Sequence, residues 1–287
     1  MNLHQWYGAA AAVAVVATAT LAGHADVAST ASWGFSEVAP DQAVPADESF
    51  GSIPLYAAGN TTLRTVAHDG GVQPVGVDDT ALDYNTWRGL APGQSVDSTA
   101  EMLSTDPGFE TDRYGGSDGG SNTFDPGTGD FSVSVWVQPT PAAQFPLGSL
   151  KPNQVSPNIV QKGRATAAGG YWKLYLQLAN QGGSLVWVPV CVLKGGNGQM
   201  AEANDPGRKG VPLTPGVGYT LTCSRTAGAM SLTIAPDGGN PVVVAGDTGA
   251  TMSVSNSEAV SVGHKPKTTD PTDVYDGLLD SLTISAG

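Results

Sequence analysis

The sequence predicts an all-β fold in which two antiparallel sheets pack face to face. The clearest evidence is the stretch from Gly129 to Pro139, where Phe131 and three valines alternate with other residues at the period of a half-buried strand. Further segments of the same kind follow at short spacing up to Ser285, separated by turn-forming glycine, proline and asparagine. No long helical periodicity interrupts them, and this combination is typical of a β-sandwich.

The strands are expected in two groups. Before residue 125 the signals are weak: Trp33 and Phe35 share one face of a short first strand, and Ser98 with Glu101 predicts one helical turn at 98–103. The other weak strands are 53–56, 63–66 and 82–87. Pro139 ends the first strong strand because it has no N–H for the ladder. The later strands are 158–162, 171–178, 184–194, 219–225, 229–234, 241–245, 250–255, 259–263 and 276–285, and the polar, turn-rich stretch 195–218 is expected to be a rim loop.

The N-terminal segment 1–25 is expected to be a secretory signal peptide. An apolar, small-residue run covers 9–22, and 23–25 supplies small residues where a signal peptidase cleaves. The run is too short and too rich in alanine for a spanning helix, and no other segment approaches the roughly 20 apolar residues that one needs. Because no Lys or Arg precedes the run, a retained N-terminal anchor is the alternative. We expect 26–287 to form one secreted domain without a membrane span.

The chain is acidic, with 26 Asp and Glu residues against 13 Lys and Arg residues and a formal net charge of −13. Such a surface repels polyphosphate, and no basic cluster is interleaved with aromatic residues, so we expect no nucleic-acid partner. Acidity in a secreted chain is typical of calcium binding or of solubility, and solubility accounts for most of these carboxylates.

The two cysteines, Cys191 and Cys223, are expected to form a disulfide. Both lie in strand-like segments with their side chains on an apolar face, and an exported protein enters an oxidising compartment. We expect the bond to join neighbouring strands and to stabilise the fold by roughly 3–4 kcal/mol. The sequence has no CxxC motif and no histidine close to either cysteine, so it does not indicate a metal site at the cysteines.

Several motifs, taken in order, resemble the laminin G-like jelly-roll domains of secreted bacterial proteins, which belong with the concanavalin A-like lectins and glucanases. These motifs are SWGF at 32–35, TGDFSVSVWVQP, NIVQKG, YWKLYL, the two cysteine strands and YDGLLDSLTIS. The resemblance is best over 126–285 and rests on the first strand before that. It implies a concanavalin A-like, two-sheet antiparallel jelly roll with adjacent first and last strands. It also implies an extracellular setting and frequent binding of glycans or proteins, sometimes with calcium.

The catalytic motifs of such relatives are missing from this chain. Glucanases of the superfamily carry E-x-D-x-E or E-x-D-x-x-E on one strand face. None of the six glutamates has that spacing: Glu37, Glu48, Glu101, Glu110, Glu202 and Glu258. Related lyases need a His, Tyr and Arg set, but His68 and His264 lie in no recognisable strand motif, and there is no nucleophile elbow. We expect a non-enzyme, with a divergent glycoside hydrolase as an alternative.

Asp280 is the candidate ligand for a structural calcium ion. It shares parity with Leu278, Leu282 and Ile284, so its carboxylate is expected on the apolar face, where it needs a cation or several donors. The resemblance implies calcium held between an Asp of the last strand and early carbonyl groups, and calcium prefers such oxygens. The alternative is a carboxylate satisfied by backbone N–H groups or water.

The candidate ligand-binding residues lie on the second faces of two strands. Tyr171 and Tyr175 lie opposite a leucine face with Lys173 and Gln177 beside them, and Trp136 faces away from the valines. Sugars stack on such rings while their hydroxyls seek polar partners. The alternatives are that this second face is buried under loops, or that Trp136 belongs to the core and the leucine face is exposed. The sequence therefore predicts a secreted recognition module for carbohydrate, or alternatively a protein-adhesion domain without a sugar site.

Overall fold

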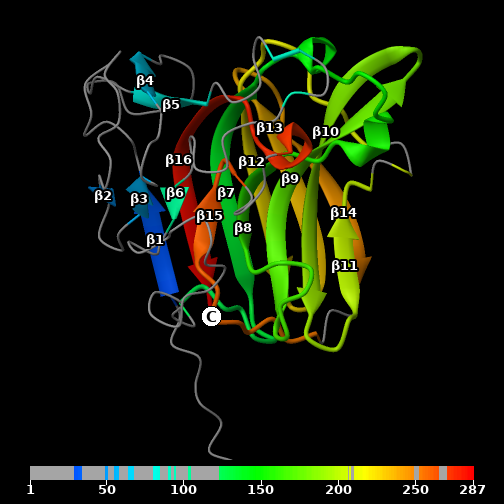
Figure 1. Cartoon of the computed structure of the whole chain (residues 1–287). Helices are drawn as coiled ribbons and strands as arrows, with labels where there is room; N and C mark the ends of the chain where they lie inside the picture. Colours follow the sequence, from blue (N-terminus) through cyan, green and yellow to red (C-terminus); the bar gives the residue numbers. More distant parts are fainter. Residues whose placement is uncertain are drawn as a thin grey trace, which may run out of the picture.

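The computed structural model describes residues 29–33, 49–50, 55–57, 64–67, 80–84, 90–91, 94, 103–104, 123–205, 207, 210–248, 252–264 and 270–287. Over these residues the fold is an all-β sandwich of two antiparallel sheets, as predicted (Figure 1). The predicted signal segment 1–25 and most of the predicted helical turn at 98–103 lie outside the described residues. In this part of the chain, no helix has the length and apolar character of a membrane span.

Sheet A contains the long central strand that the sequence indicated most clearly. Its order is β14 (Val242–Thr248), β13 (Ala229–Pro236), β12 (Tyr219–Thr226), β7 (Phe131–Pro139), β16 (Gly277–Ala286), β5 (Thr80–Tyr84) and β4 (Arg64–Ala67). In addition, β1 (Ser29–Trp33) pairs antiparallel with β16, so the first and last strands are adjacent.

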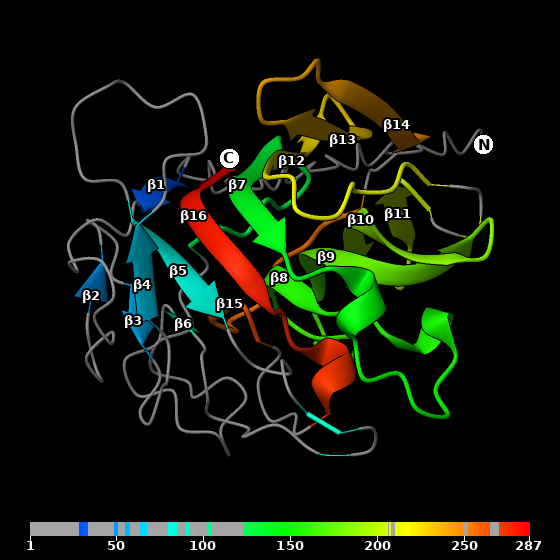
Figure 2. The same cartoon turned by 90° about the horizontal axis from the view of Figure 1, so that it is seen from above.

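Sheet B forms the second layer. Its order is β11 (Met200–Ala203), β10 (Ser184–Gly195), β9 (Gly170–Gln181), β8 (Asn158–Lys162), β15 (Val260–Val262), β6 (Leu103–Ser104), β3 (Leu55–Ala57) and β2 (Ser49–Phe50). Three short 3-10 helices lie in the described connections: η1 (Ala142–Gln144), η2 (Pro152–Gln154) and η4 (Pro271–Asp273). Figure 2 shows the edge strands β14 and β11 on the same side of the sandwich, where their residues are in contact.

The core lies between the two sheets and is built by the predicted alternation. On β7, the side chains of Phe131, Val133, Val135 and Val137 are buried, and the ring centre of Phe131 lies 4.9 Å from that of Trp172 on β9. Two predictions about strands are wrong. The expected rim loop 195–218 contains β11, and the expected strand 250–255 shows only an isolated bridge between Val254 and Gly127 over its described part.

The predicted disulfide between Cys191 and Cys223 is present, but it joins the two sheets. Cys191 lies on β10 of sheet B and Cys223 on β12 of sheet A, with their Cα atoms 5.4 Å apart. Both cysteines are fully buried. The expectation of a bond between neighbouring strands is therefore wrong, because both side chains point into the core from opposite layers.

A buried lysine ties the segment 252–258 to the rest of the fold. The Lys162 ammonium pairs with the Asp125 carboxylate at 3.0 Å and donates to the backbone carbonyl oxygens of Asn256 and Glu258 at 2.7 and 2.8 Å. Burial lowers the pKa of Lys162, and the Asp125 charge acts against that shift. The ion pair is therefore satisfied on several sides, as a buried charge requires.

Candidate functional site

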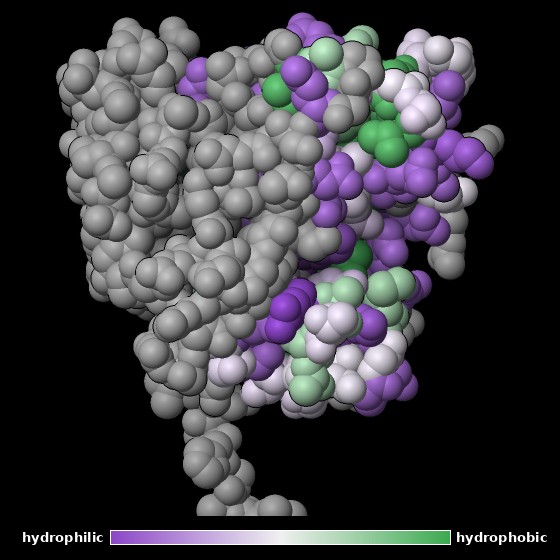
Figure 3. Space-filling view, viewed as in Figure 1, coloured by the Kyte–Doolittle hydropathy of each residue, from purple (hydrophilic) through white to green (hydrophobic). Residues whose placement is uncertain are grey.

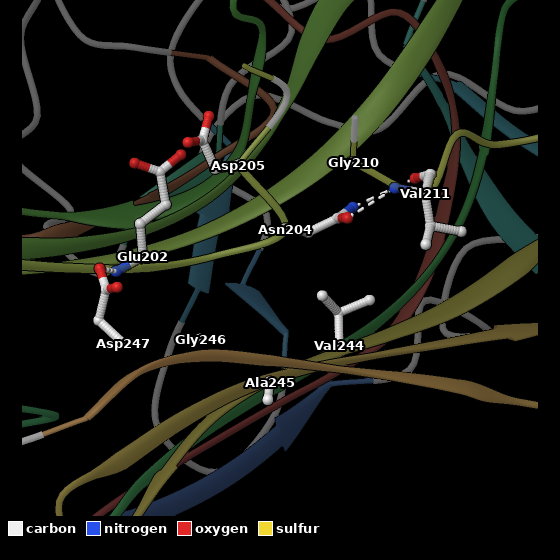
Figure 4. A pocket seen from close by; sticks show the side chains of 9 residues that line it. All are labelled: Glu202, Asn204, Asp205, Gly210, Val211, Val244, Ala245, Gly246 and Asp247. Atoms are coloured by element: carbon white, nitrogen blue, oxygen red, sulfur yellow. Dashed lines mark hydrogen bonds between the residues drawn. The ribbon is translucent and has the colours of Figure 1, made fainter. Parts of the chain in front are cut away.

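A pocket lies between the edge strands β11 and β14. Its volume is about 220 Å³, and Figure 4 shows its lining residues. The lining combines three carboxylates, one amide and two larger apolar side chains: Glu202, Asp205, Asp247, Asn204, Val211 and Val244. Figure 4 places Glu202, Asp205 and Asp247 on one side of the pocket, with Val244 and Val211 on the other. The pocket thus offers hydrogen-bond acceptors beside an apolar wall.

Gly246 allows β14 to approach β11 closely beside this pocket. A Cβ atom at position 246 would lie 2.6 Å from the carbonyl oxygen of Glu202 and 2.8 Å from the Cβ of Ala203. The Asp247 carboxylate accepts a hydrogen bond from the Glu202 N–H at 3.2 Å. The edges of the two sheets are therefore held together here.

Asn204 lines the pocket together with Val211, and its side-chain polar atoms form hydrogen bonds within the fold. Its backbone has φ 66°, a left-handed conformation that asparagine tolerates better than most residues. The side-chain amide donates to the carbonyl oxygens of Pro189 and Val211 at 2.7 and 3.1 Å, and Oδ1 accepts from the Val211 N–H at 2.7 Å. Contacts to a ligand would therefore fall mainly to the carboxylates.

The carboxylates of the pocket adjoin the two predicted tyrosines. The strand register places Glu202 on the outer face of sheet B, which also carries Tyr171 and Tyr175. Burial raises the pKa of Tyr171, and the Glu202 charge adds to the effect. Burial also raises the pKa of Tyr175, with smaller contributions from the charges of Glu202 and Asp205. Glu202 of the pocket and the two tyrosines therefore lie on the same face of sheet B.

The two tyrosines differ in accessibility. Tyr171 is partly exposed, and the Lys194 ammonium lies 5.9 Å from its ring centre. Tyr175 is only 8% exposed, and the Lys173 ammonium lies 3.7 Å above its ring centre. Tyr171 is therefore the ring of this pair that a ligand can reach without a rearrangement.

Gln177 and Trp136 make contacts within the fold. The Gln177 side chain, on the same face as the tyrosines, donates to the carbonyl oxygen of Val155 at 2.7 Å. Trp136 is 4% exposed and lies on the outer face of sheet A, where its indole N–H donates to both carboxylate oxygens of Asp237 at 3.1 Å. The structure thus brings Tyr171, Tyr175, Lys173 and Gln177 together and places Trp136 on the other layer.

Asp280 is buried, but it does not lie on the apolar face as expected. The register of β16 against β7 shifts between Asp280 and Thr283, and Ser281 has φ 51°, so a β-bulge reverses the alternation of faces. Leu279 therefore faces the core, and Asp280 lies opposite Trp136 on the outer face. In the described ranges, no three His, Cys, Asp or Glu side chains gather closely enough to hold a metal ion. Calcium at Asp280 stays a prediction from the sequence.

On the side of the molecule shown in Figure 3, the described surface is largely hydrophilic, with smaller hydrophobic areas among the polar ones.

The sequence alone did not identify the carboxylates of Asp205 and Asp247 as pocket residues, nor the place of Glu202 beside them. The available signals were the polar turn after Glu202 and the glycine directly before Asp247. Neither signal shows that these segments meet.

No protein-family model and no curated protein matches this sequence. Among solved structures, the enzymatically active domain of tailspike protein 2 from bacteriophage CBA120 is similar with a TM-score of 0.41 and 13% identity, covering 72% of this chain and 25% of that chain. The SAP-like pentraxin from Limulus polyphemus has a TM-score of 0.34 and 11% identity, covering 55% of this chain and 65% of that one. Domains LG4-5 of the mouse laminin alpha1 chain have a TM-score of 0.32 and 13% identity, covering 54% and 34%. The chain thus spans about a quarter of the length of the tailspike domain, and its fold assignment rests on its own strand pairing.

Proposed function

We propose that this domain is a secreted, non-catalytic module that binds carbohydrate at the pocket between β11 and β14 and at the adjoining Tyr171. The observation that carries the proposal is the position of Glu202. Its carboxylate lines the pocket, and the strand register places it on the same outer face of sheet B as Tyr171. A ligand that needs an aromatic face and several acceptors at once therefore finds both in one place.

The chemistry of the lining suits a polyhydroxyl ligand. Sugar hydroxyls donate to the carboxylates of Glu202, Asp205 and Asp247, and hydrogen bonds to charged acceptors are the stronger kind. The C–H face of the sugar packs on Tyr171 or on the wall formed by Val211 and Val244. Small-molecule sites commonly combine an apolar wall with a few polar groups that fix orientation. The non-catalytic role rests on the sequence, where no glutamate has the glucanase spacing.

The test is a glycan-array screen of the folded, oxidised chain, run with calcium and again with a chelator. We expect binding to a defined sugar class. Calcium dependence would make Asp280 the next residue to substitute. Silence under both conditions would overturn the carbohydrate proposal and favour an adhesion domain. Release of product from a bound glycan would overturn the non-catalytic role.

Variants then locate the site by titration calorimetry with the best glycan. Tyr171→Ala and Asp205→Asn should each weaken binding roughly 3- to 10-fold, the effect of losing one ordinary contact. The matched control is Asp270→Asn, because Asp270 caps η4 by accepting from the Thr272 N–H and lies outside the pocket lining. If both site variants bind like this control, the pocket is not the sugar site.

A further inference from the structure

β14 is an edge strand with uncovered apolar residues. It pairs with β13 on one side and with no strand of the described residues on the other. Val242 is 45% exposed and Val243 is 65% exposed. Together with Met200 on the neighbouring edge strand β11, these are the exposed large hydrophobic residues of the described part of the chain. All three therefore lie on the side of the sandwich where the two sheet edges meet.

The backbone of this edge is suited to pairing with another strand. An edge strand presents unpaired N–H and C=O groups, which proteins usually protect with lysine, proline or a bulge. Residues 242–248 contain no lysine, arginine or proline. Val242 to Ala245 keep a regular register against β13, and the register shift comes only after them. Pro241 directly precedes this part of β14 and the bulge follows it, so Val242 to Ala245 form a short, regular template between them.

The charges around the edge determine which partner fits. No Lys or Arg occurs in the sequence from Ala227 to Gly263, whereas Asp247 lies near the end of β14. Glu202 of β11 adds a second carboxylate, and its N–H donates to Asp247. A second copy of the chain has a net charge of −13 and would bring the same carboxylates to this edge. Charge complementarity therefore favours a basic partner over a second copy.

We propose that the β14 edge binds an extended, basic segment of another protein by β-strand addition. Main-chain hydrogen bonds to Val242–Ala245 would supply affinity, as in other complexes of this kind. Apolar side chains of the segment cover Val243, and its Lys or Arg side chains reach Asp247. This interaction goes beyond the proposed binding of carbohydrate, and it shares Val244, Ala245 and Asp247 with the pocket.

The test uses synthetic peptides and the whole chain. The probe is an eight-residue peptide in which valine and threonine alternate with lysine, and its affinity is measured by fluorescence polarisation at low and high salt. One control peptide has glutamate in place of lysine, and a second carries N-methyl groups on alternate residues, which block main-chain pairing. We expect the lysine peptide to bind at least about tenfold more tightly than either control and to weaken as salt rises.

Val243→Lys tests the surface itself, since a 65% exposed position tolerates lysine without loss of core packing. This variant should bind the lysine peptide at least about tenfold more weakly than the unaltered chain. Ala143→Lys adds the same charge at an exposed position of η1 and should leave the affinity unchanged. Absent binding of the lysine peptide would overturn the proposal, as would equal binding of any control peptide or equal effects of the two variants. A concentration-dependent dimer that Val243→Lys abolishes, measured by sedimentation, would assign the edge to a second copy and overturn it too.

Discussion

Reduction of the disulfide between Cys191 and Cys223 is expected to lower the free energy of unfolding by about 3.7 kcal/mol, from the chain-entropy relation applied to a sequence separation of 32 residues. The relation counts only the restriction of the unfolded chain. Neither β10 nor β12 depends on the bond for its pairing, because each keeps its partner strands within its own sheet. For a domain of this size, that loss corresponds to a decrease in Tm of roughly 7–15 °C.

The assay is guanidinium unfolding followed by tryptophan fluorescence, with and without reductant. The control is the double variant Cys191→Ala/Cys223→Ala, which should start at the lower stability and should not respond to reductant. A loss below about 1 kcal/mol on reduction would show that the unfolded chain gains little freedom, which would refute the reasoning from loop length. A response of the double variant would show that the reductant acts elsewhere.

Three further predictions concern the core, the tyrosines and the pocket. Lys162→Met should lower the free energy of unfolding by about 3–5 kcal/mol, because it leaves the Asp125 carboxylate buried without its partner, whereas exposed Lys151→Met should cost under about 0.5 kcal/mol. Equal costs in denaturant unfolding would contradict this. The folded pKa of Tyr175 is raised above the unfolded value of about 10, so its stabilisation is complete below that pH and is lost as pH rises through the folded pKa. An ultraviolet titration should show a late-ionising phenol that Tyr175→Phe removes, and uniform titration near the ordinary pKa would count against it. Gly246→Ala should cost about 1–3 kcal/mol, because its Cβ would clash with Glu202, and should weaken any glycan hit; unchanged stability would mean that the sheet edges separate freely.

The sequence predicts the bounds of a strand well where a turn residue marks its end. The prediction of 158–162 matches β8 in both bounds, and Gly163 with φ 78° follows directly. By contrast, β11 is only four residues long and buries just Ala201 and Ala203, so it shows no strong strand preference. It forms because β10 supplies a ladder beside it, which no local pattern of β11 indicates.

The converse error at 250–255 has a related cause. Met252 and Val254 are buried in alternation, as a strand pattern requires. The main chain of this segment, however, bonds to Gly127, Gly169 and Gly196 in three separate loops rather than to one continuous strand. Alternating burial therefore indicates which side chains lie inside, and it leaves open which backbone groups satisfy the main chain.

The predicted face of a side chain is wrong where an extra residue interrupts the alternation of a strand. The parity of Asp280 with Leu282 and Ile284 holds only for a regular strand, and the bulge at Ser281 inserts one residue between them. The error at Cys191 and Cys223 is different, because the inward face was predicted correctly and only the layer was not. Parity specifies a face within one strand, whereas the layer depends on pairings between distant segments.

The candidate site also depends on contacts between distant segments, which explains why the sequence alone did not reveal it. Glu202 and Asp247 are 45 residues apart, and each is an ordinary acidic residue near a turn in its own segment. They meet because β11 and β14 end their sheets on the same side and because Gly246 leaves room for the contact. Patterns of alternation describe sheet faces, whereas this pocket and the exposed valines belong to sheet edges.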